Sequence, residues 1–178
     1  IAGTQEIELG RIHAFPNHPF KVLDDERMDT LVESIRENGI LNQVIVRPDK
    51  NGDYEMISGH RRLHAAGIVG LSKIPAIVKE MSDDEAIIKM VDANIQREEI
   101  LPSEKAFAYK MKLEAMKRTA GRPTKENACH NGTHLRSDQE LALQVGDSAR
   151  SIQRYIRLTE LIPELLECID NKKLGLVI

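Results

Sequence analysis

Gly59 separates a strand-like run, Tyr54–Ile57, from a helical stretch that opens with Arg61 and Arg62, and this junction constrains the fold more than any other part of the chain. Such a junction directs backbone N–H groups and the positive end of a helix at one point. Two guanidinium groups there add fork-shaped donors that match phosphate oxygens. On its own, a Gly-x-Arg-Arg sequence more often marks surface arginines after a turn, so its function has to be judged from the rest of the chain.

A second polar segment, residues 92–104, has the sequence DANIQREEILPSE. Together with GHRR at 59–62 it resembles two boxes of the ParB family of chromosome and plasmid partition proteins, GERR and ENxQRxxLxPxE. The segment FPNHPF at 15–20 is similar to the NPxQPR segment of that family, and residues 31–40 with 44–47 are similar to its LaxSIxxxGxxxPixVR stretch. These motifs agree in order and spacing, so the resemblance extends over nearly the whole chain.

The composition of the 178-residue chain favours an aliphatic core and local rather than global contacts with DNA. Aromatic residues make up 3% and Trp is absent, while the net charge is −3. Any contact with nucleic acid therefore requires a local basic patch. The two cysteines, Cys129 and Cys168, indicate no disulfide framework. No apolar run reaches transmembrane length and no signal peptide is visible, so we expect a cytoplasmic protein, and a fragment because the chain begins at Ile1.

The order of periodic segments predicts an α+β chain, with a mixed α/β part followed by helices. The ParB resemblance implies that the first part is a small mixed α/β ParB/sulfiredoxin-like N-terminal domain and that the last part is an all-α helix-turn-helix domain. We expect an α/β nucleotide-binding domain over 1–80, linking helices that complete the nucleotide pocket over 81–117, a flexible polar loop over 118–136, and the helix-turn-helix domain over 137–178. Within the loop, GRP at 121–123 is typical of a minor-groove arm. Cys129, His130 and His134 are typical metal ligands, but both patterns are too short to be specific.

Local signals place the elements of the first domain and of the linking helices. The alternation of Ile7 and Leu9 with polar neighbours predicts a strand. Further expected elements are a helix capped by Asp24 or Asp25 and ending at Gly39, a hairpin of strand 44–46 with a turn at 51–53, a strand at 74–78, a helix opened by a capping box of Ser82 and Glu85, and a helix beginning near Pro102.

A helix-turn-helix is predicted near the end of the chain. Ser137 and Glu140 form a second capping box, Gly146 ends the first short helix, and Asp147 or Ser148 caps a second helix. This second helix runs to about residue 160, and a third, 161–169, is expected to support it.

The expected second helix has an apolar stripe, Ile152 with Ile156 and Leu158, and an opposite polar face. We assign DNA binding to that face and its cap, namely Ser148, Arg150, Ser151, Gln153, Arg154 and Arg157. Residues at the beginning of such a helix meet base edges, and later basic residues meet phosphates. The same pattern is equally typical of a helical hairpin with a solvated basic face, and the ParB resemblance favours DNA binding.

The ParB resemblance implies one CTP pocket built from the two boxes. Its nucleotide-binding residues would be Gly59, His60, Arg61, Arg62, Asn94 and Arg97, with Asn94 also a ligand of Mg²⁺. Arg97 is either a phosphate ligand or the ion-pair partner of Glu98 or Glu104. His60 and Ala93 replace the acids of the two family boxes, and Ala93 has no group to orient a water. We therefore expect CTP binding with weak or absent hydrolysis, and assign no catalytic residue.

The resemblance also implies partners. These are double-stranded DNA carrying a centromere-like, parS-like site, a second copy of the chain in a homodimer that closes as a clamp on CTP binding, and a ParA-type ATPase, at a nucleoid-associated location without membrane contact. The dimerisation domain would lie beyond residue 178. Two alternatives are a helix-turn-helix transcriptional regulator without nucleotide control and a sulfiredoxin-fold enzyme such as a phosphotransferase or nuclease. Sulfiredoxin-like chemistry needs a cysteine beside the arginine box, and residues 57–64 contain none.

Overall fold

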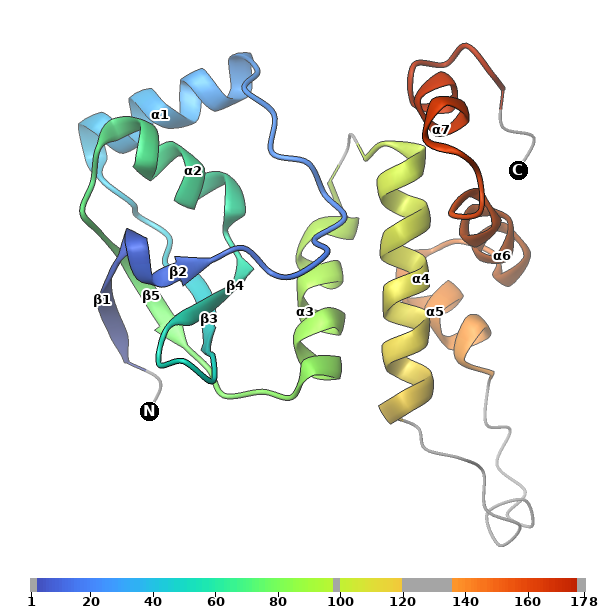
Figure 1. Ribbon diagram of the computed structural model, residues 1–178, viewed down its shortest axis with the longest axis horizontal. Coiled ribbons are helices and arrows are strands. Elements are labelled where there is room, and N and C mark those ends of the chain that lie inside the picture. Colours follow the sequence, from blue (N-terminus) through green and yellow to red (C-terminus); the bar gives the residue numbers. More distant parts are fainter. Residues whose placement is uncertain (1–2, 98–99, 120–135, 176–178) are drawn as a thin grey trace, which may run out of the picture. The chain divides into compact units, whose positions relative to one another are not determined.

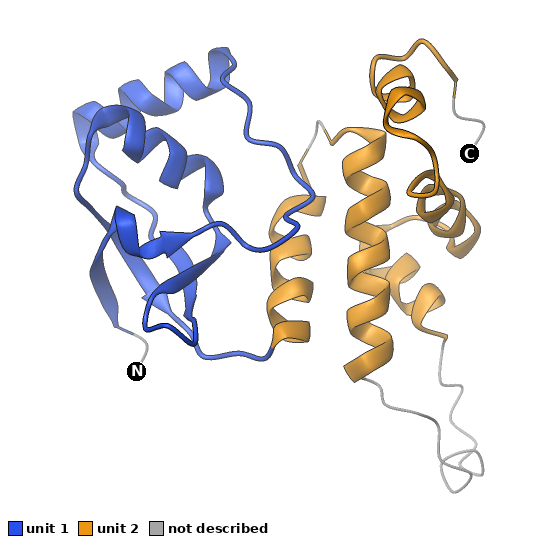
Figure 2. Cartoon of the chain, viewed as in Figure 1, with its two compact units in different colours: residues 1–82 blue, residues 83–178 orange. Residues whose placement is uncertain are grey.

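The computed structural model describes residues 3–97, 100–119 and 136–175 (Figure 1). By its internal contacts the chain divides into two compact units, residues 1–82 and 83–178 (Figure 2). The first unit is mixed α/β and the second consists of helices. The predicted fold class is thereby confirmed.

The first unit contains a five-stranded sheet with the strand order β1-β5-β3-β4-β2. Its strands are β1 Thr4–Glu8, β2 Ile12–His13, β3 Val44–Pro48, β4 Tyr54–Ser58 and β5 Lys73–Val78. Strands β3 and β4 pair antiparallel, as the predicted hairpin requires, while β3 and β5 pair parallel. The expectation that Leu9 continues the first strand is wrong, because β1 ends at Glu8 and Leu9–Arg11 form the 3₁₀ helix η1.

Helices α1 (Glu26–Asn38) and α2 (His60–Val69) pack side by side in this unit through a cluster that includes Met28 and Ala65. Asp25 caps α1, since its Oδ1 accepts the backbone N–H of Met28 at 2.9 Å. Gly39 follows the helix with a φ of 69°. Both predicted ends of α1 are therefore confirmed. The core beneath the sheet is aliphatic, as the composition predicts, and contains Val44, Val46, Met56, Ile74 and Ala76.

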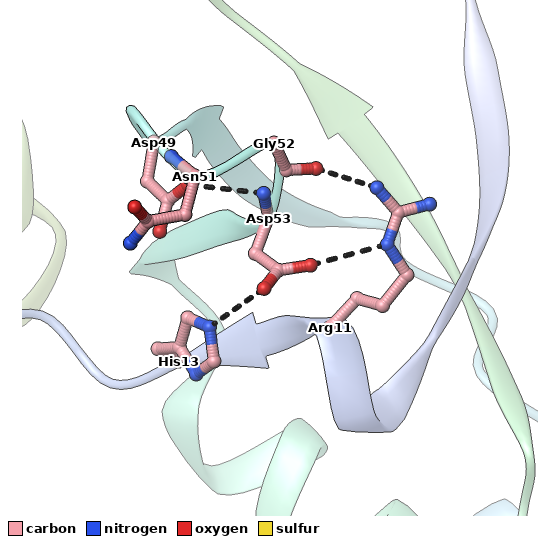
Figure 3. A network of polar contacts seen from close by, with 6 residues as sticks. All are labelled: Arg11, His13, Asp49, Asn51, Gly52 and Asp53. Atoms are coloured by element: carbon pink, nitrogen blue, oxygen red, sulfur yellow. Dashed lines mark hydrogen bonds and ion pairs between the residues drawn. The ribbon is translucent and has the colours of Figure 1, made fainter.

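A polar network ties the β2 edge to the turn of the β3–β4 hairpin (Figure 3). Arg11 donates to the carbonyl oxygen of Gly52 at 2.5 Å and to Asp53 Oδ1 at 3.3 Å. The other carboxylate oxygen of Asp53 lies 3.5 Å from His13 Nε2. Asp49 Oδ1 holds the turn from inside by accepting the backbone N–H of Asp53 at 2.9 Å. These contacts give the two-residue strand β2 a fixed place in the sheet.

In the second unit, the other helices pack against the longest helix, α4. The helices are α3 Asp83–Ile95, α4 Pro102–Thr119, α5 Ser137–Val145, α6 Ala149–Leu158 and α7 Pro163–Asp170. Buried Tyr109, Leu113 and Met116 of α4 pack with Leu141 of α5 and Ile152 of α6. None of the described helices is long and apolar enough to cross a membrane.

The first and last residues of the predicted polar loop belong to helices or their caps. Arg118 and Thr119 end α4, and Arg136 is the N-cap of α5. The predicted capping box of Ser137 and Glu140 is wrong by one position. The helix begins one residue earlier, so Gln139 Oε1 accepts the backbone N–H of Arg136 at 3.1 Å. The minor-groove and metal-ligand patterns at 121–134 lie outside the described residues, as does Glu98.

Candidate nucleotide-binding and DNA-binding sites

Gly59 is required by both conformation and space. It precedes α2 with a φ of 120°, in a region that residues with a side chain rarely adopt. A Cβ added at this position would lie 2.6 Å from Val44 Cγ1, so the junction passes against β3 with no room for a side chain. The predicted strand–glycine–helix junction is therefore present, and it places His60, Arg61 and Arg62 in the first turn of α2.

The guanidinium group of Arg62 is fixed on the loop that leads into β3. Its Nη1 donates to the carbonyl oxygen of Gln43 at 2.8 Å and also to that of Asn42. Burial lowers the pKa of Arg62, yet an arginine stays protonated at any physiological pH. Arg62 thus places a positive charge beside Gly59 while it satisfies two backbone acceptors.

Arg61 is held differently, by the N-terminus of α1. Its Nη2 lies 3.1 Å from Asp25 Oδ1, the same oxygen that caps α1, and its side chain is 26% exposed. The hydrogen bond from the Met28 backbone lowers the pKa of Asp25; burial opposes this and Arg61 adds to it. A neighbouring pair repeats the arrangement, since His64 Nε2 lies 2.7 Å from Asp24 Oδ1.

His60 lies inside the first unit rather than on its surface. It is 8% exposed, and its ring centroid is 3.7 Å from that of His18. His18 belongs to the FPNHPF segment, so the structure brings this segment together with the arginine box. The His60 ring also borders a hollow of about 500 Å³, which is lined by Ala14, Val22, His60, Leu63, His64, Gly67 and Ile68. The hollow is largely apolar, and neither Arg61 nor Arg62 is among the residues that line it.

The second box lies at the end of α3, in the other unit. Asn94 is 5% exposed, and its Nδ2 donates to the carbonyl oxygen of Met90 at 2.8 Å, which leaves the amide oxygen as the atom suited to a hard cation. The backbone N–H of Arg97 donates to the Asn94 carbonyl oxygen at 3.1 Å. Glu104 Oε2 accepts the backbone N–H of Leu101 at 3.1 Å and so caps α4. Because the boxes belong to separate units, a joint pocket stays a prediction.

The helix-turn-helix is formed by α5 and α6. Gly146 ends α5 with a φ of 74°, and Ser148 Oγ caps α6 by accepting the backbone N–H of Ser151 at 3.0 Å. Ile152 faces the core and is fully buried. The opposite side of α6 carries a hollow of about 260 Å³ lined by Arg150, Gln153, Arg154 and Arg157. The structure therefore gathers the longer predicted DNA-binding side chains on one face of α6. Ser148 caps the N-terminal end of this helix, and the Ser151 hydroxyl lies 3.0 Å from that of Ser148.

The turn between α5 and α6 is anchored to α4 by contacts that no sequence pattern indicated. Asp147 Oδ2 accepts a hydrogen bond from the Tyr109 hydroxyl and lies 2.8 Å from Lys105 Nζ. The Lys105 ammonium is also 4.8 Å from the centre of the Tyr155 ring. Asp138 was likewise missed, and it contacts Gln153 on α6. Charged residues spaced far apart along the chain carry no motif, so only the fold could reveal these pairs.

A mixed α/β unit with an arginine-bearing strand–glycine–helix junction, joined to a helix-turn-helix with a basic exposed face, defines a class of two-part helix-turn-helix proteins. The sequence profile of the ParB N-terminal domain matches residues 2–95, and the chain belongs to this family.

Relatives are similar in sequence to both units of this chain. The chain is 34% identical over 170 residues to the chromosome-partitioning protein Spo0J of Thermus thermophilus, covering 96% of this chain and 56% of that protein. It is 31% identical over 177 residues to the nucleoid occlusion protein of Listeria monocytogenes, covering 98% and 55%. The chain thus spans little more than half the length of these relatives.

Solved structures show the same fold. C-terminally truncated ParB from Caulobacter crescentus, complexed to the centromeric parS site, has a TM-score of 0.58 at 23% identity, covering 96% of this chain and 80% of that one. A Pnob8-like ParB-N domain has a TM-score of 0.61 at 14% identity, covering 96% and 74%.

Proposed function

We propose that the protein is a partition protein that binds a centromere-like site in double-stranded DNA through α6 and binds CTP at the Gly59 junction. The observation that carries the DNA part is the cluster of Arg150, Gln153, Arg154 and Arg157 around one hollow on the exposed face of α6. With a net charge of −3, the chain has no general attraction for DNA, and a local cluster of this kind supplies it. The name of the Thermus relative and the parS complex of the Caulobacter protein support the same assignment.

The nucleotide part rests on the junction and on the family motifs. Arg61 keeps part of its surface exposed, Arg62 adds a fixed positive charge, and the start of α2 adds backbone N–H groups. The hollow that His60 borders, about 500 Å³, has a size typical of small-molecule sites, about 300–1,000 Å³. The two arginines and the N-terminus of α2 fit the anionic end of a ligand. The choice of CTP, and the roles of Asn94 toward Mg²⁺ and of Arg97 toward a phosphate, come from the ParB motifs.

Nucleotide binding would act as a switch. Binding energy that differs between an open and a closed dimer is enough to close a clamp, and no chemical step is required. Hydrolysis would additionally need an oriented water, and the side chain of Ala93 has no polar atom. His60, which stands where the family has its other acid, is buried against His18. The proposal therefore includes a homodimer at the nucleoid with feeble CTP turnover, and a ParA-type ATPase as its partner.

The experiment that tests this function is a calorimetric titration of CTP, ATP, GTP and UTP against the purified protein with Mg²⁺, with and without DNA containing a parS-like site. We expect saturable binding of CTP alone, which is lost in Arg61→Ala. Equal binding of all four nucleotides, or of none, would contradict the CTP assignment. Site-specific DNA binding without any nucleotide binding would favour a simple helix-turn-helix regulator.

A further inference from the structure

Asp138 holds the side chain of Gln153 in the helix-turn-helix. Oδ2 of Asp138, in the first turn of α5, lies 3.4 Å from Nε2 of Gln153 on α6. The carboxylate itself is fixed, because Oδ1 accepts the backbone N–H of Gln139 at 3.1 Å and Oδ2 accepts from Arg136 Nη2 at 3.2 Å. The Asp138 side chain is only 11% exposed, whereas Gln153 is exposed. A buried and anchored group thus contacts an exposed group on the face proposed to meet DNA.

The chemistry of this contact selects one orientation of the Gln153 amide. A glutamine amide presents a carbonyl oxygen on one side and an NH₂ group on the other, and the two differ little in shape. A carboxylate accepts hydrogen bonds and donates none, so only the NH₂ group can face Asp138. One amide hydrogen of Gln153 is used in this contact. The second hydrogen and the carbonyl oxygen remain as one donor and one acceptor.

We propose that Asp138 is a positioning residue that makes Gln153 select adenine over guanine in the major groove, an inference that rests on the proposed DNA binding by α6. Adenine presents an acceptor, N7, next to a donor, the N6 amino group, and this matches one donor and one acceptor on the glutamine. Guanine presents two acceptors, N7 and O6. A glutamine would need both of its amide hydrogens to pair with guanine, and Asp138 occupies one of them.

Arg136 makes this arrangement compatible with DNA. A carboxylate close to the duplex would repel the phosphates, and the pair with Arg136 offsets its charge. The Arg136 side chain is 78% exposed, so its remaining donors stay available to phosphate oxygens. Asp138 therefore has one partner toward the base-reading side chain and another toward solvent.

The test compares base preferences of the purified protein with those of Asp138→Asn and Gln153→Ala, using a pool of randomised double-stranded DNA. In the wild type we expect one base-pair position per half-site with adenine preferred over guanine by about tenfold, and loss of this preference in Gln153→Ala. Asp138→Asn has the same shape but can donate as well as accept, so the Gln153 amide can turn over. The adenine preference should then fall to below about threefold at that position alone.

The outcomes separate this inference from the proposed function. A wild type that selects no sequence removes both. A selective wild type in which Asp138→Asn keeps the full adenine preference, or in which all positions weaken together, overturns only the positioning role. Melting temperature, expected to change little in Asp138→Asn, and low-salt binding to non-specific DNA, expected to be at least as strong as in the wild type because a negative charge is removed, report whether the fold is intact.

Exchanging the carboxylate and the amide between positions 138 and 153 tests the same contact. Gln153→Glu places two carboxylates opposite each other and should weaken binding by at least tenfold. Combining it with Asp138→Asn lets the introduced amide donate to the introduced carboxylate, which should restore binding and move the preference at that position to cytosine, the partner of a glutamate. A double variant that binds no better than Gln153→Glu alone overturns the inference even if Asp138→Asn is poorly folded.

Discussion

Lys112 Nζ on α4 lies 2.5 Å from Asp92 Oδ1 on α3, and the Lys112 side chain is 1% exposed whereas that of Asp92 is 50% exposed. The pair joins the helix that carries the second family box to the helix on which the helix-turn-helix packs. The loss of stability depends on which partner is removed. Without the exposed Asp92 the buried Lys112 charge is left unpaired, whereas without Lys112 the Asp92 charge is left in water.

We expect Asp92→Ala to lower the free energy of unfolding by about 1–3 kcal/mol, as for a charged group that loses its partner. Lys112→Met, which fills the same space with an apolar chain, should cost less. The double variant should be more stable than Asp92→Ala alone. Urea unfolding followed by circular dichroism measures all three, and a Lys112→Met variant less stable than Asp92→Ala would contradict the argument.

Two glycines of α2 and its cap should respond in opposite directions to alanine. Gly59→Ala meets Val44 Cγ1 at 2.6 Å and retains a φ of 120°, so it should destabilise the first unit by about 1–3 kcal/mol or more. Gly67→Ala is the matched control, because a Cβ there meets nothing within 4 Å and the residue is helical. It should stabilise by about 0.5–1 kcal/mol. Thermal unfolding of the two variants checks the contrast, which fails if both shift in the same direction.

Local signals in the sequence were enough to predict the ends of several helices and the turn of the hairpin. Gly39 ends α1 and residues 51–53 turn the hairpin as predicted. Each cap was narrowed to two neighbouring residues, of which Asp25 caps α1 and Ser148 caps α6. All of these effects depend on neighbours within a few residues. The start of α5 was predicted one residue too late, because Ser137 is a typical N-cap residue and Arg136 is not, yet Arg136 is the N-cap and Gln139 completes its capping box.

Pairs that are distant in sequence could not be predicted from it. Asp25 with Arg61, Asp147 with Lys105, and Asp138 with Gln153 carry no spacing rule. Each depends on how two helices pack, and helix packing is set by whole apolar faces rather than by the charged residues themselves. The residue types of the candidate sites were thus predictable, but the partners that orient them were not.

The two arginines of the box should separate into a structural and a binding role. Arg62→Ala leaves the carbonyl oxygens of Asn42 and Gln43 without their donor and should cost about 1–3 kcal/mol of stability. Arg61→Ala breaks a partly exposed pair with Asp25 and should cost less than about 1 kcal/mol. Chemical unfolding, with CTP titration on the same samples, should show Arg61→Ala folded but unable to bind. A fully stable Arg62→Ala would contradict its structural role.

Acid should weaken the anchor of the helix-turn-helix. Burial tends to raise the pKa of Asp147, but hydrogen bonds from Lys105 and Tyr109 lower it below its usual 3.8. A carboxyl group with a lowered pKa in the folded state contributes stability above its unfolded pKa and loses it as pH falls through the folded value. The stability difference between wild type and Asp147→Asn should therefore be constant near neutral pH and shrink below about pH 4. A difference that grows on acidification would contradict this sign.

The polar face of α6 should contain residues that select the DNA sequence and residues that only bind the phosphate backbone. Arg157, near the C-terminal end of α6, is expected to contact phosphate, so Arg157→Ala should weaken binding to all sequences alike and reduce the slope of log affinity against log salt by about 1. Arg150, near the N-terminal end, is expected to reach a base edge, so Arg150→Ala should cost about 1–3 kcal/mol at a specific site and little on random DNA. Fluorescence anisotropy at several salt concentrations, with specific and random duplexes, measures both quantities. Equal losses on the two duplexes for Arg150→Ala would mean that the base-reading end of the helix lies elsewhere.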